Sequence, residues 1–265
     1  MIKDYKKKFN LQNKLAFVAG GLGYIGKEIV EALISMDCKV VVLDNFSKKN
    51  NKNENIHHEH IDLSKTSKLK KSFYKIIKKY GTADIFINAS YPKTKDWIKN
   101  SFKEISLKSF ETNVKIHLNS YIWCSKIIAE HMLKNKINGS IINLSSIYGL
   151  VAQDLEIYKG TDMKDNMSYS VIKGGINSFT KQMSSYYGKF NIRVNAICPG
   201  GVINFEDKTK LKVQKLFERN YIKKVPMKRF ARTDEIASAV IFLSSDASSY
   251  ITGTLLPVDG GWTAI

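Results

Sequence analysis

The chain has 265 residues, of which 43% are hydrophobic, so it can form one sizeable core and is not disordered throughout. No apolar run reaches the ~18 residues of a membrane span, and the basic N-terminal segment lacks the apolar stretch of a secretory signal. The net charge of +18 comes from lysines spread along the whole chain. Only four of the 42 basic residues are arginine, which argues against a nucleic-acid surface.

The three cysteines, Cys38, Cys124 and Cys198, lie far apart in apolar surroundings and form no C-x-x-C motif. This spacing argues against a disulfide framework and against a zinc site. We therefore expect a cytoplasmic protein with no bound metal, no nucleic-acid partner and no membrane association. The chain shows no linker that would separate two domains, so we expect a single domain over residues 1–265.

Short apolar runs of strand length alternate with longer segments that carry apolar residues at helical spacing. The expected strands are 15–19, 39–43, 85–88, 140–144, 192–197 and 255–258, and the expected helices are 25–35, 67–80, 107–134, 169–187 and 233–244. The polar segment 47–55 is expected to form a loop. This alternation predicts an α/β fold, a single doubly wound Rossmann-type domain with a mostly parallel sheet of about seven strands.

A glycine-rich turn follows the first expected strand and opens the first expected helix. Glycines in such a turn let backbone N–H groups approach a pyrophosphate at the N-terminus of the helix. The turn alone is weak evidence, but an acidic residue about 20 positions later strengthens the prediction of a dinucleotide site. The predicted cofactor contacts in this segment are Gly20, Gly23, Tyr24, Ile25 and Gly26.

The acidic residue is Asp44, which ends the second expected strand. Its carboxylate can accept both ribose hydroxyls of NAD and would repel the 2′-phosphate of NADP. We therefore expect NAD as the cofactor, with NADP less favoured; the alternative is that Asp44 only terminates the strand. Lys48 and Lys49 lie just beyond it and would weaken the discrimination against NADP.

Tyr169 and Lys173 are spaced i and i+4, so they share one face of the expected helix 169–187. An ammonium beside a phenol favours the phenolate, so we expect the pKa of Tyr169 to be lowered toward neutrality, as proton transfer to a substrate oxygen requires. The same pattern occurs on solvated helix surfaces, but here Ser145 and Ser146 also end an upstream strand. Strand alternation points only one of the two serines into the site.

These residues resemble the short-chain dehydrogenase/reductase family, in its single-domain branch, over almost the whole chain. The resemblance implies that Ser146 orients the substrate carbonyl or hydroxyl, that Tyr169 is the acid/base and that Lys173 bonds the nicotinamide ribose. The further cofactor contacts that it implies are Asp62 and Leu63 beside the adenine, Pro199 and Gly200 beside the nicotinamide, and Asn88, Ala89, Ser90 and Val202.

The sequence departs from the family pattern at several positions. Tyr24 stands where the single-domain branch usually has its middle glycine, and Asn204 replaces a threonine that would touch the cofactor amide. The family's fourth catalytic residue is a helix asparagine. We predict Asn113 for this role, with His117 and Asn119 as alternatives, because Asn113 lies about one helical turn from the expected place.

Two variable segments are expected to surround the substrate. The polar insertion between Ser146 and Tyr169 resembles that of family members associated with bacterial surface-sugar and flagellin-glycan modification; alternatively, it packs at a subunit edge. Its stretch Asp154–Asn166 carries acids such as Asp162, and the segment 206–224 carries many lysines, among them Lys208 and Lys224. Carboxylates can accept sugar hydroxyls and lysines can neutralise a phosphate.

The resemblance implies an NAD-dependent oxidoreductase that interconverts an alcohol and a carbonyl. The two variable segments favour a sugar-derived substrate for it, such as a sugar phosphate or nucleotide sugar. Two alternatives remain: a 3-oxoacyl-acyl-carrier-protein reductase, whose basic surface would bind an acidic carrier protein, and a cofactor-binding regulatory protein without catalysis. Asp44 argues against the first, and the presence of Ser146, Tyr169 and Lys173 argues against the second. The resemblance also implies a homodimer or homotetramer.

Overall fold

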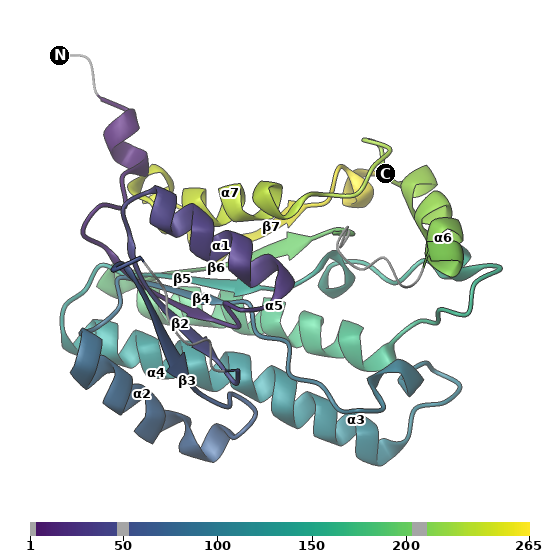
Figure 1. The fold of residues 1–265 in the computed structure, drawn as a ribbon, viewed down its shortest axis with the longest axis horizontal. Coiled ribbons are helices and arrows are strands. Elements are labelled where there is room, and N and C mark those ends of the chain that lie inside the picture. The colour runs from purple at the N-terminus through teal and green to yellow at the C-terminus, as the bar shows by residue number, and fades with distance from the viewer. Residues whose placement is uncertain (1–3, 47–52, 203–210) are drawn as a thin grey trace.

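The computed structural model describes residues 4–46, 53–202 and 211–265, which form one seven-stranded parallel sheet (Figure 1). The strand order is β3-β2-β1-β4-β5-β6-β7, so the winding reverses between β1 and β4. The strands are β1 Leu15–Ala19, β2 Lys39–Asp44, β3 Ile56–His60, β4 Ile85–Asn88, β5 Ser140–Leu144, β6 Arg193–Pro199 and β7 Leu255–Val258. The predicted doubly wound Rossmann-type fold is confirmed.

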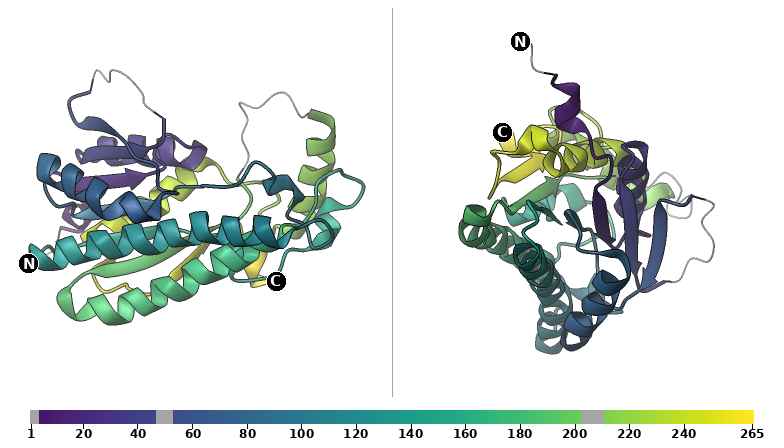
Figure 2. Two further views of the ribbon diagram at one scale, coloured as in Figure 1. Left: turned by 90° about the horizontal axis from the view of Figure 1, so that it is seen from below. Right: turned by 90° about the vertical axis from the view of Figure 1, so that its left-hand side faces the viewer.

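Helices cover both faces of the sheet (Figure 2). On one face, α1 (Tyr24–Ser35) and α7 (Thr233–Ser244) pack on side chains such as Ala16 and Val18 of β1. On the other, α2 (Thr66–Tyr80), α4 (Asn119–Lys134) and α5 (Met167–Tyr187) pack on Phe17 and Ala19 of the same strand. Both faces are apolar, which explains why the strands appear in the sequence as continuous apolar runs.

Three elements differ from the prediction. Strand β3 has the sequence Ile-His-His-Glu-His and was not expected, because it lies at the edge of the sheet and needs little apolar surface. The expected helix 107–134 is divided into α3 (Leu107–Asn113), a π-helical turn (Val114–Leu118) and α4. Part of the lysine-rich segment 206–224 forms the helix α6 (Leu211–Lys224), which is not among the expected helices.

The carboxyl ends of the parallel strands meet at one edge of the sheet, where the loops that carry the predicted site motifs emerge. The reversal between β1 and β4 creates the crevice in which open α/β folds bind their ligands. A separate apolar cluster forms beyond this edge, where Ile157 of the insertion packs near Tyr221 of α6 and Trp262. Within the described residues, no helix has the length and apolar character needed to cross a membrane.

Candidate active site

The glycine-rich turn lies at the reversal point and is packed so tightly that side chains do not fit. Gly20 has a φ of +75°, and a Cβ there would lie 2.6 Å from the Cα of Ser90. A Cβ at Gly26 would collide with the carbonyl oxygen of Gly20. These glycines therefore bring the loop after β1, the loop after β4 and the start of α1 together, as a dinucleotide cradle requires.

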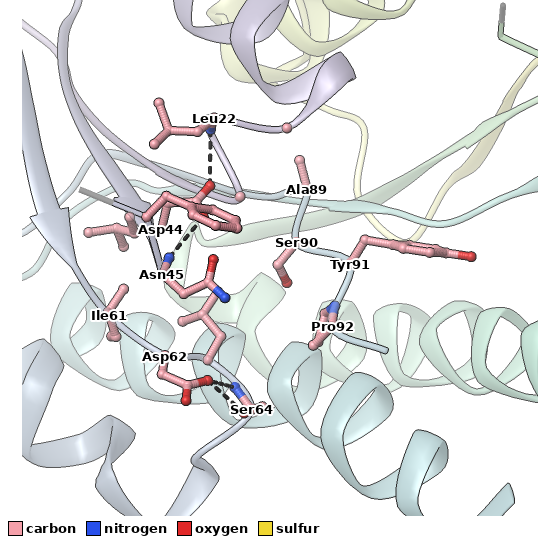
Figure 3. A pocket seen from close by; sticks show the side chains of 15 residues that line it. Leu22, Asp44, Asn45, Ile61, Asp62, Ser64, Ala89, Ser90, Tyr91 and Pro92 are labelled. Carbon is pink, nitrogen blue, oxygen red and sulfur yellow. Dashed lines mark hydrogen bonds between the residues drawn. The ribbon is translucent and has the colours of Figure 1, made fainter. Parts of the chain in front are cut away.

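A pocket opens beside this turn and gathers many of the predicted cofactor contacts (Figure 3). Seven predicted residues line it: Gly20, Gly23, Asp44, Asp62, Leu63, Ala89 and Ser90. The prediction missed other lining residues, among them Leu22, Asn45, Phe46, Ile61, Tyr91 and Pro92. Most of these are direct neighbours of predicted positions, so the motif spacing locates the pocket but not its full wall.

Two carboxylates are held in fixed positions on the wall of this pocket. Asp44 accepts hydrogen bonds from the backbone N–H of Leu22 at 3.1 Å and from that of Asn45 at 2.8 Å, which ties the end of β2 to the glycine turn. Asp62 accepts a hydrogen bond of 2.6 Å from the Ser64 hydroxyl. Burial opposes ionisation of Asp62, but its bonds with Ser64 and Lys65 prevail and lower its pKa. Lys48 and Lys49 lie outside the described residues.

Other predicted cofactor residues have supporting positions. Asn88 is buried and accepts a 2.7 Å hydrogen bond from the Ser90 hydroxyl, which shapes the turn after β4. Tyr24, Ile25 and Gly26 begin α1 and are not on the pocket wall. Pro199 ends β6, and Gly200 donates its N–H to the carbonyl of Val258 at 3.0 Å.

The loop after β6 is fixed by a second contact. Val202 pairs with Ala231 in an isolated parallel bridge, so the chain following Gly200 stays beside the carboxyl edge of the sheet. A Cβ on Gly200 would lie 2.9 Å from the Cα of Asp259, which explains the need for glycine there. Asn204 lies outside the described residues.

Ser146, Tyr169 and Lys173 come together where β5 ends against α5. The Ser146 side chain is hydrogen-bonded to that of Tyr169 and accepts a 3.2 Å bond from the N–H of Tyr148. The Lys173 ammonium lies 5.6 Å from the centre of the Tyr169 ring and donates to the carbonyl of Leu144 at 2.8 Å. Ser145 instead donates to the backbone carbonyl of Lys173, so it is Ser146 whose hydroxyl meets Tyr169.

The electrostatics of this group differ from the expectation. Burial raises the pKa of Tyr169, and the hydrogen bond with Ser146 only partly opposes this effect. Burial also lowers the pKa of Lys173 to about 7. The prediction of a lowered pKa for Tyr169 was therefore wrong, because burial of the phenol outweighs the hydrogen bond that favours the phenolate.

Asn113 is buried, but its side chain serves a network apart from Lys173. It accepts a 3.0 Å bond from the N–H of Thr94 and donates to the Thr94 hydroxyl at 2.8 Å and to the carbonyl of Ser109 at 2.9 Å. Asn100 lies in the same network and accepts a 2.6 Å bond from Ser168 at the start of α5. The side chain of Asn113 thus holds the loop after β4 against α3 and α5.

Aromatic side chains that the prediction missed enclose Tyr169. Tyr91 and Trp97 lie with their ring centres 6.0 and 6.3 Å from that of Tyr169, and Tyr148 lies at 6.4 Å. His117, named only as an alternative, lies 5.0 Å from Tyr91. The position of Tyr91 directly after Asn88-Ala89-Ser90 was the only sequence signal for this wall.

The insertion and α6 bind each other rather than presenting free charges. Asp154 forms a 2.9 Å ion pair with Lys224, and the Asn220 amide donates to the carbonyl of Lys159 at 3.0 Å. Tyr158 stacks on Phe217 with ring centres 5.9 Å apart. The insertion thus packs on α6 of its own chain, whereas Asp162 is exposed. Lys208 lies outside the described residues.

Comparisons with known proteins show which family and which relatives the chain resembles. A family model described as enoyl-(acyl carrier protein) reductase matches residues 23–263. The chain is 31% identical to post-translational flagellin modification protein A of Campylobacter coli, over 95% of this chain and 99% of the relative. It is 29% identical to glucose 1-dehydrogenase 2 of Bacillus subtilis, over 96% of both chains.

Among solved structures, a short-chain dehydrogenase from Leptospira borgpetersenii with bound NAD⁺ superposes with a TM-score of 0.85. It is 29% identical and covers 99% of this chain, and the superposition covers 97% of its own length. The match to the family model spans most of the chain and agrees with this likeness in fold. The chain therefore belongs to the short-chain dehydrogenase/reductase family.

Proposed function

We propose that the protein is an NAD(H)-dependent oxidoreductase that interconverts an alcohol and a carbonyl. One observation carries the proposal: the hydrogen-bonded side chains of Ser146 and Tyr169 meet Lys173 at the edge of the sheet where the glycine turn forms its cradle. The NAD⁺-bound relative from Leptospira supports the choice of cofactor.

The residues present fit a nicotinamide dinucleotide. The cradle around Gly20 and Gly26 leaves backbone N–H groups free of side chains, and Asp44 lies where a ribose would enter the pocket. A bound nicotinamide would supply the hydride or accept it. The protein's own task is then to orient the substrate oxygen and to move one proton.

Each of the three side chains has a distinct part in that task. The hydroxyl of Ser146 hydrogen-bonds the substrate oxygen and holds it near Tyr169. The phenol of Tyr169 donates its proton to this oxygen during reduction and takes it back during oxidation. The raised pKa of Tyr169 keeps the phenol protonated before reduction, while the charged form of Lys173 is needed to stabilise the phenolate that remains.

A test of this activity follows the reduced nicotinamide while the protein is offered alcohols with NAD⁺ and carbonyls with NADH. The proposal expects turnover on at least one substrate class, in both directions. Tight binding of NADH without turnover on any member of a broad panel would contradict it and would favour the cofactor-binding regulatory alternative.

Asp44 should make NADH the preferred cofactor. Its carboxylate would repel a 2′-phosphate, so we expect NADH to bind on the order of tenfold more tightly than NADPH in fluorescence titrations. The Asp44→Asn variant should narrow this difference mainly by improving NADPH binding. Asp37→Asn, a change at an exposed position before β2, is the matched control. Equal binding of both cofactors by the unaltered protein would contradict the role of Asp44.

We propose a sugar derivative, such as a sugar phosphate or nucleotide sugar, as the substrate. The flagellin modification and glucose dehydrogenase relatives support this class, and so do the aromatic faces around Tyr169, on which sugar rings can stack. Asp154 and Lys224 form an ion pair with each other, so we do not assign either charge to substrate binding. Asp162 is exposed and is still available to accept sugar hydroxyls.

The second candidate is a 3-oxoacyl-acyl-carrier-protein reductase, which is supported by relatives of that name, such as the one from Chlamydia trachomatis that is 32% identical over 95% of this chain. Sugar phosphates, nucleotide sugars and acyl thioesters tested in parallel with NAD(H) separate the two. Turnover of long acyl thioesters, with none of any sugar derivative, would refute the sugar proposal and establish this alternative.

We also propose that the protein assembles as a homodimer or homotetramer. Exposed apolar side chains support this, among them Leu107 of α3, Trp123 of α4, and Val171 and Tyr186 of α5. Sedimentation analysis should show a dimer or tetramer, and a monomer at micromolar concentration would contradict it.

A further inference from the structure

His117 is a buried side chain whose polar atoms have no hydrogen-bond partner. It lies in the π-helical turn between α3 and α4, its side chain is inaccessible, and both of its ring nitrogens are unpaired. Buried polar side-chain atoms are nearly always hydrogen-bonded, so an imidazole with two unpaired nitrogens requires an explanation. Single π-helical turns occur frequently at functional sites.

The surroundings of His117 are those of Lys173. The centre of the Tyr91 ring lies 5.0 Å from the centre of the His117 ring and 5.9 Å from the Lys173 nitrogen. The centre of the Tyr121 ring lies 5.6 Å from the first and 5.2 Å from the second. Both side chains therefore lie against the same two aromatic rings, next to Tyr169.

The two groups have complementary hydrogen-bonding needs. An ammonium has three N–H donors, and among the described residues Lys173 donates only to the carbonyl of Leu144, which also accepts from the Tyr121 hydroxyl at 3.1 Å. Burial, and next the charge of Lys173, lower the pKa of His117 well below its ordinary value. The imidazole is therefore neutral near pH 7 and offers one lone-pair nitrogen as an acceptor.

The other polar side chains near Lys173 do not provide such an acceptor. Asn113, the predicted fourth site residue, has its side-chain oxygen engaged by Thr94. The titratable groups of the surrounding elements near His117 and Lys173 are Tyr91, Tyr121, Tyr169, Cys124 and Cys198. The phenols and thiols have raised pKa values because they are buried, and no carboxylate is among them.

We propose that His117 is a positioning residue whose neutral imidazole accepts a hydrogen bond from the Lys173 ammonium, directly or through one water molecule, and so keeps Lys173 charged and directed at Tyr169. The inference rests on the proposed oxidoreductase function and adds to it a residue that acts through Lys173. Burial is the main cause that brings the pKa of Lys173 to about 7, so an added acceptor decides how much of it is charged in neutral solution.

Two variants separate positioning from packing. His117→Phe keeps a ring without an acceptor, and we expect kcat for carbonyl reduction to fall roughly tenfold at pH 8, with a smaller change in KM. The pH at which the activity declines on the alkaline side should also move lower, since Lys173 loses its proton more easily. His117→Gln restores an acceptor and should keep both kcat and the pH profile near those of the unaltered protein.

His131→Phe in the last turn of α4 is the matched control, because it makes the same change away from Lys173 and should leave kcat and the pH profile unchanged. Thermal unfolding of each variant reports any loss of packing separately. A His117→Phe enzyme with an unaltered kcat and pH profile would overturn the proposal. So would a His117→Gln enzyme that is as impaired as His117→Phe.

A spectroscopic measurement tests the contact without relying on turnover. In protein labelled with ¹⁵N-histidine, His117 should stay neutral at pH 7, with one ring nitrogen shifted as expected for a hydrogen-bond acceptor. This shift should disappear in Lys173→Met, whereas an identical His117 spectrum in that variant would overturn the proposal. An inactive but normally labelled wild-type protein would instead refute the proposed oxidoreductase function and leave the contact intact.

Discussion

Lys173 is buried without a carboxylate partner among the described residues, and this has a measurable consequence for stability. Its pKa is about 7 in the folded protein, because burial disfavours the charged form, whereas an unfolded lysine titrates near its model value of 10.5. Between these values the unfolded chain binds one more proton than the folded protein. The cost of burying the ammonium is therefore present in full below about pH 7 and is relieved as the pH rises to 10.5.

The free energy of unfolding of the cofactor-free protein should accordingly rise with pH relative to that of Lys173→Met. We expect the difference between the two proteins to change by roughly 1 kcal/mol per pH unit between pH 7.5 and 9.5. Urea denaturation of both proteins at several pH values measures it. A difference that stays constant with pH would show that Lys173 is not desolvated as the structure indicates.

Which residues gather at the site could be predicted from the sequence, but their electrostatics could not. The order and spacing of Gly20, Asp44, Ser146, Tyr169 and Lys173 are local features, and a parallel sheet necessarily brings its carboxyl ends together. The direction of the pKa shift of Tyr169 depends on burial by distant segments. Spacing alone does not contain this information.

Among the structural elements, the glycine turn makes the most specific demand on side-chain size. Gly26→Ala would place a methyl group against the Gly20 carbonyl, so we expect destabilisation of about 1–3 kcal/mol and a marked loss of NADH binding. Gly188→Ala at the end of α5 meets no atom within 4 Å and should be neutral or slightly stabilising. Urea denaturation and NADH titration of both variants test the prediction. Normal NADH affinity in Gly26→Ala would contradict it.

The elements that escaped prediction lack a distinctive pattern of their own. The polar strand β3 is held by its backbone pairing with β2, which its sequence does not reveal. The π-helical turn Val114–Leu118 interrupts an otherwise continuous helical periodicity, and only the unexpected spacing of Asn113 pointed to it. Helix α6 has many lysines, but Phe217 stacks on Tyr158 of the insertion and Tyr221 stacks on Trp262.

At the scale of the whole molecule, the nucleotide pocket joins β1, β2 and β4 through the loops at their carboxyl ends. A ligand that binds only the folded protein stabilises it by mass action. At a concentration of about 100 times its dissociation constant, NADH should stabilise the protein by about 2.7 kcal/mol, and NADPH at the same concentration should do so less. Thermal unfolding scans with each cofactor measure this, and a larger shift with NADPH would contradict the pocket assignment.

The central claim is that Tyr169 transfers the proton during alcohol and carbonyl interconversion. The most direct measurement compares single-turnover hydride transfer in the wild-type protein and in Tyr169→Phe, with NADH affinity measured on the same samples. We expect transfer to slow by about 10²–10⁴-fold while the NADH dissociation constant stays nearly unchanged, because only the proton-transferring hydroxyl is lost. A Tyr169→Phe enzyme that transfers hydride to the same substrate at the wild-type rate would contradict the account.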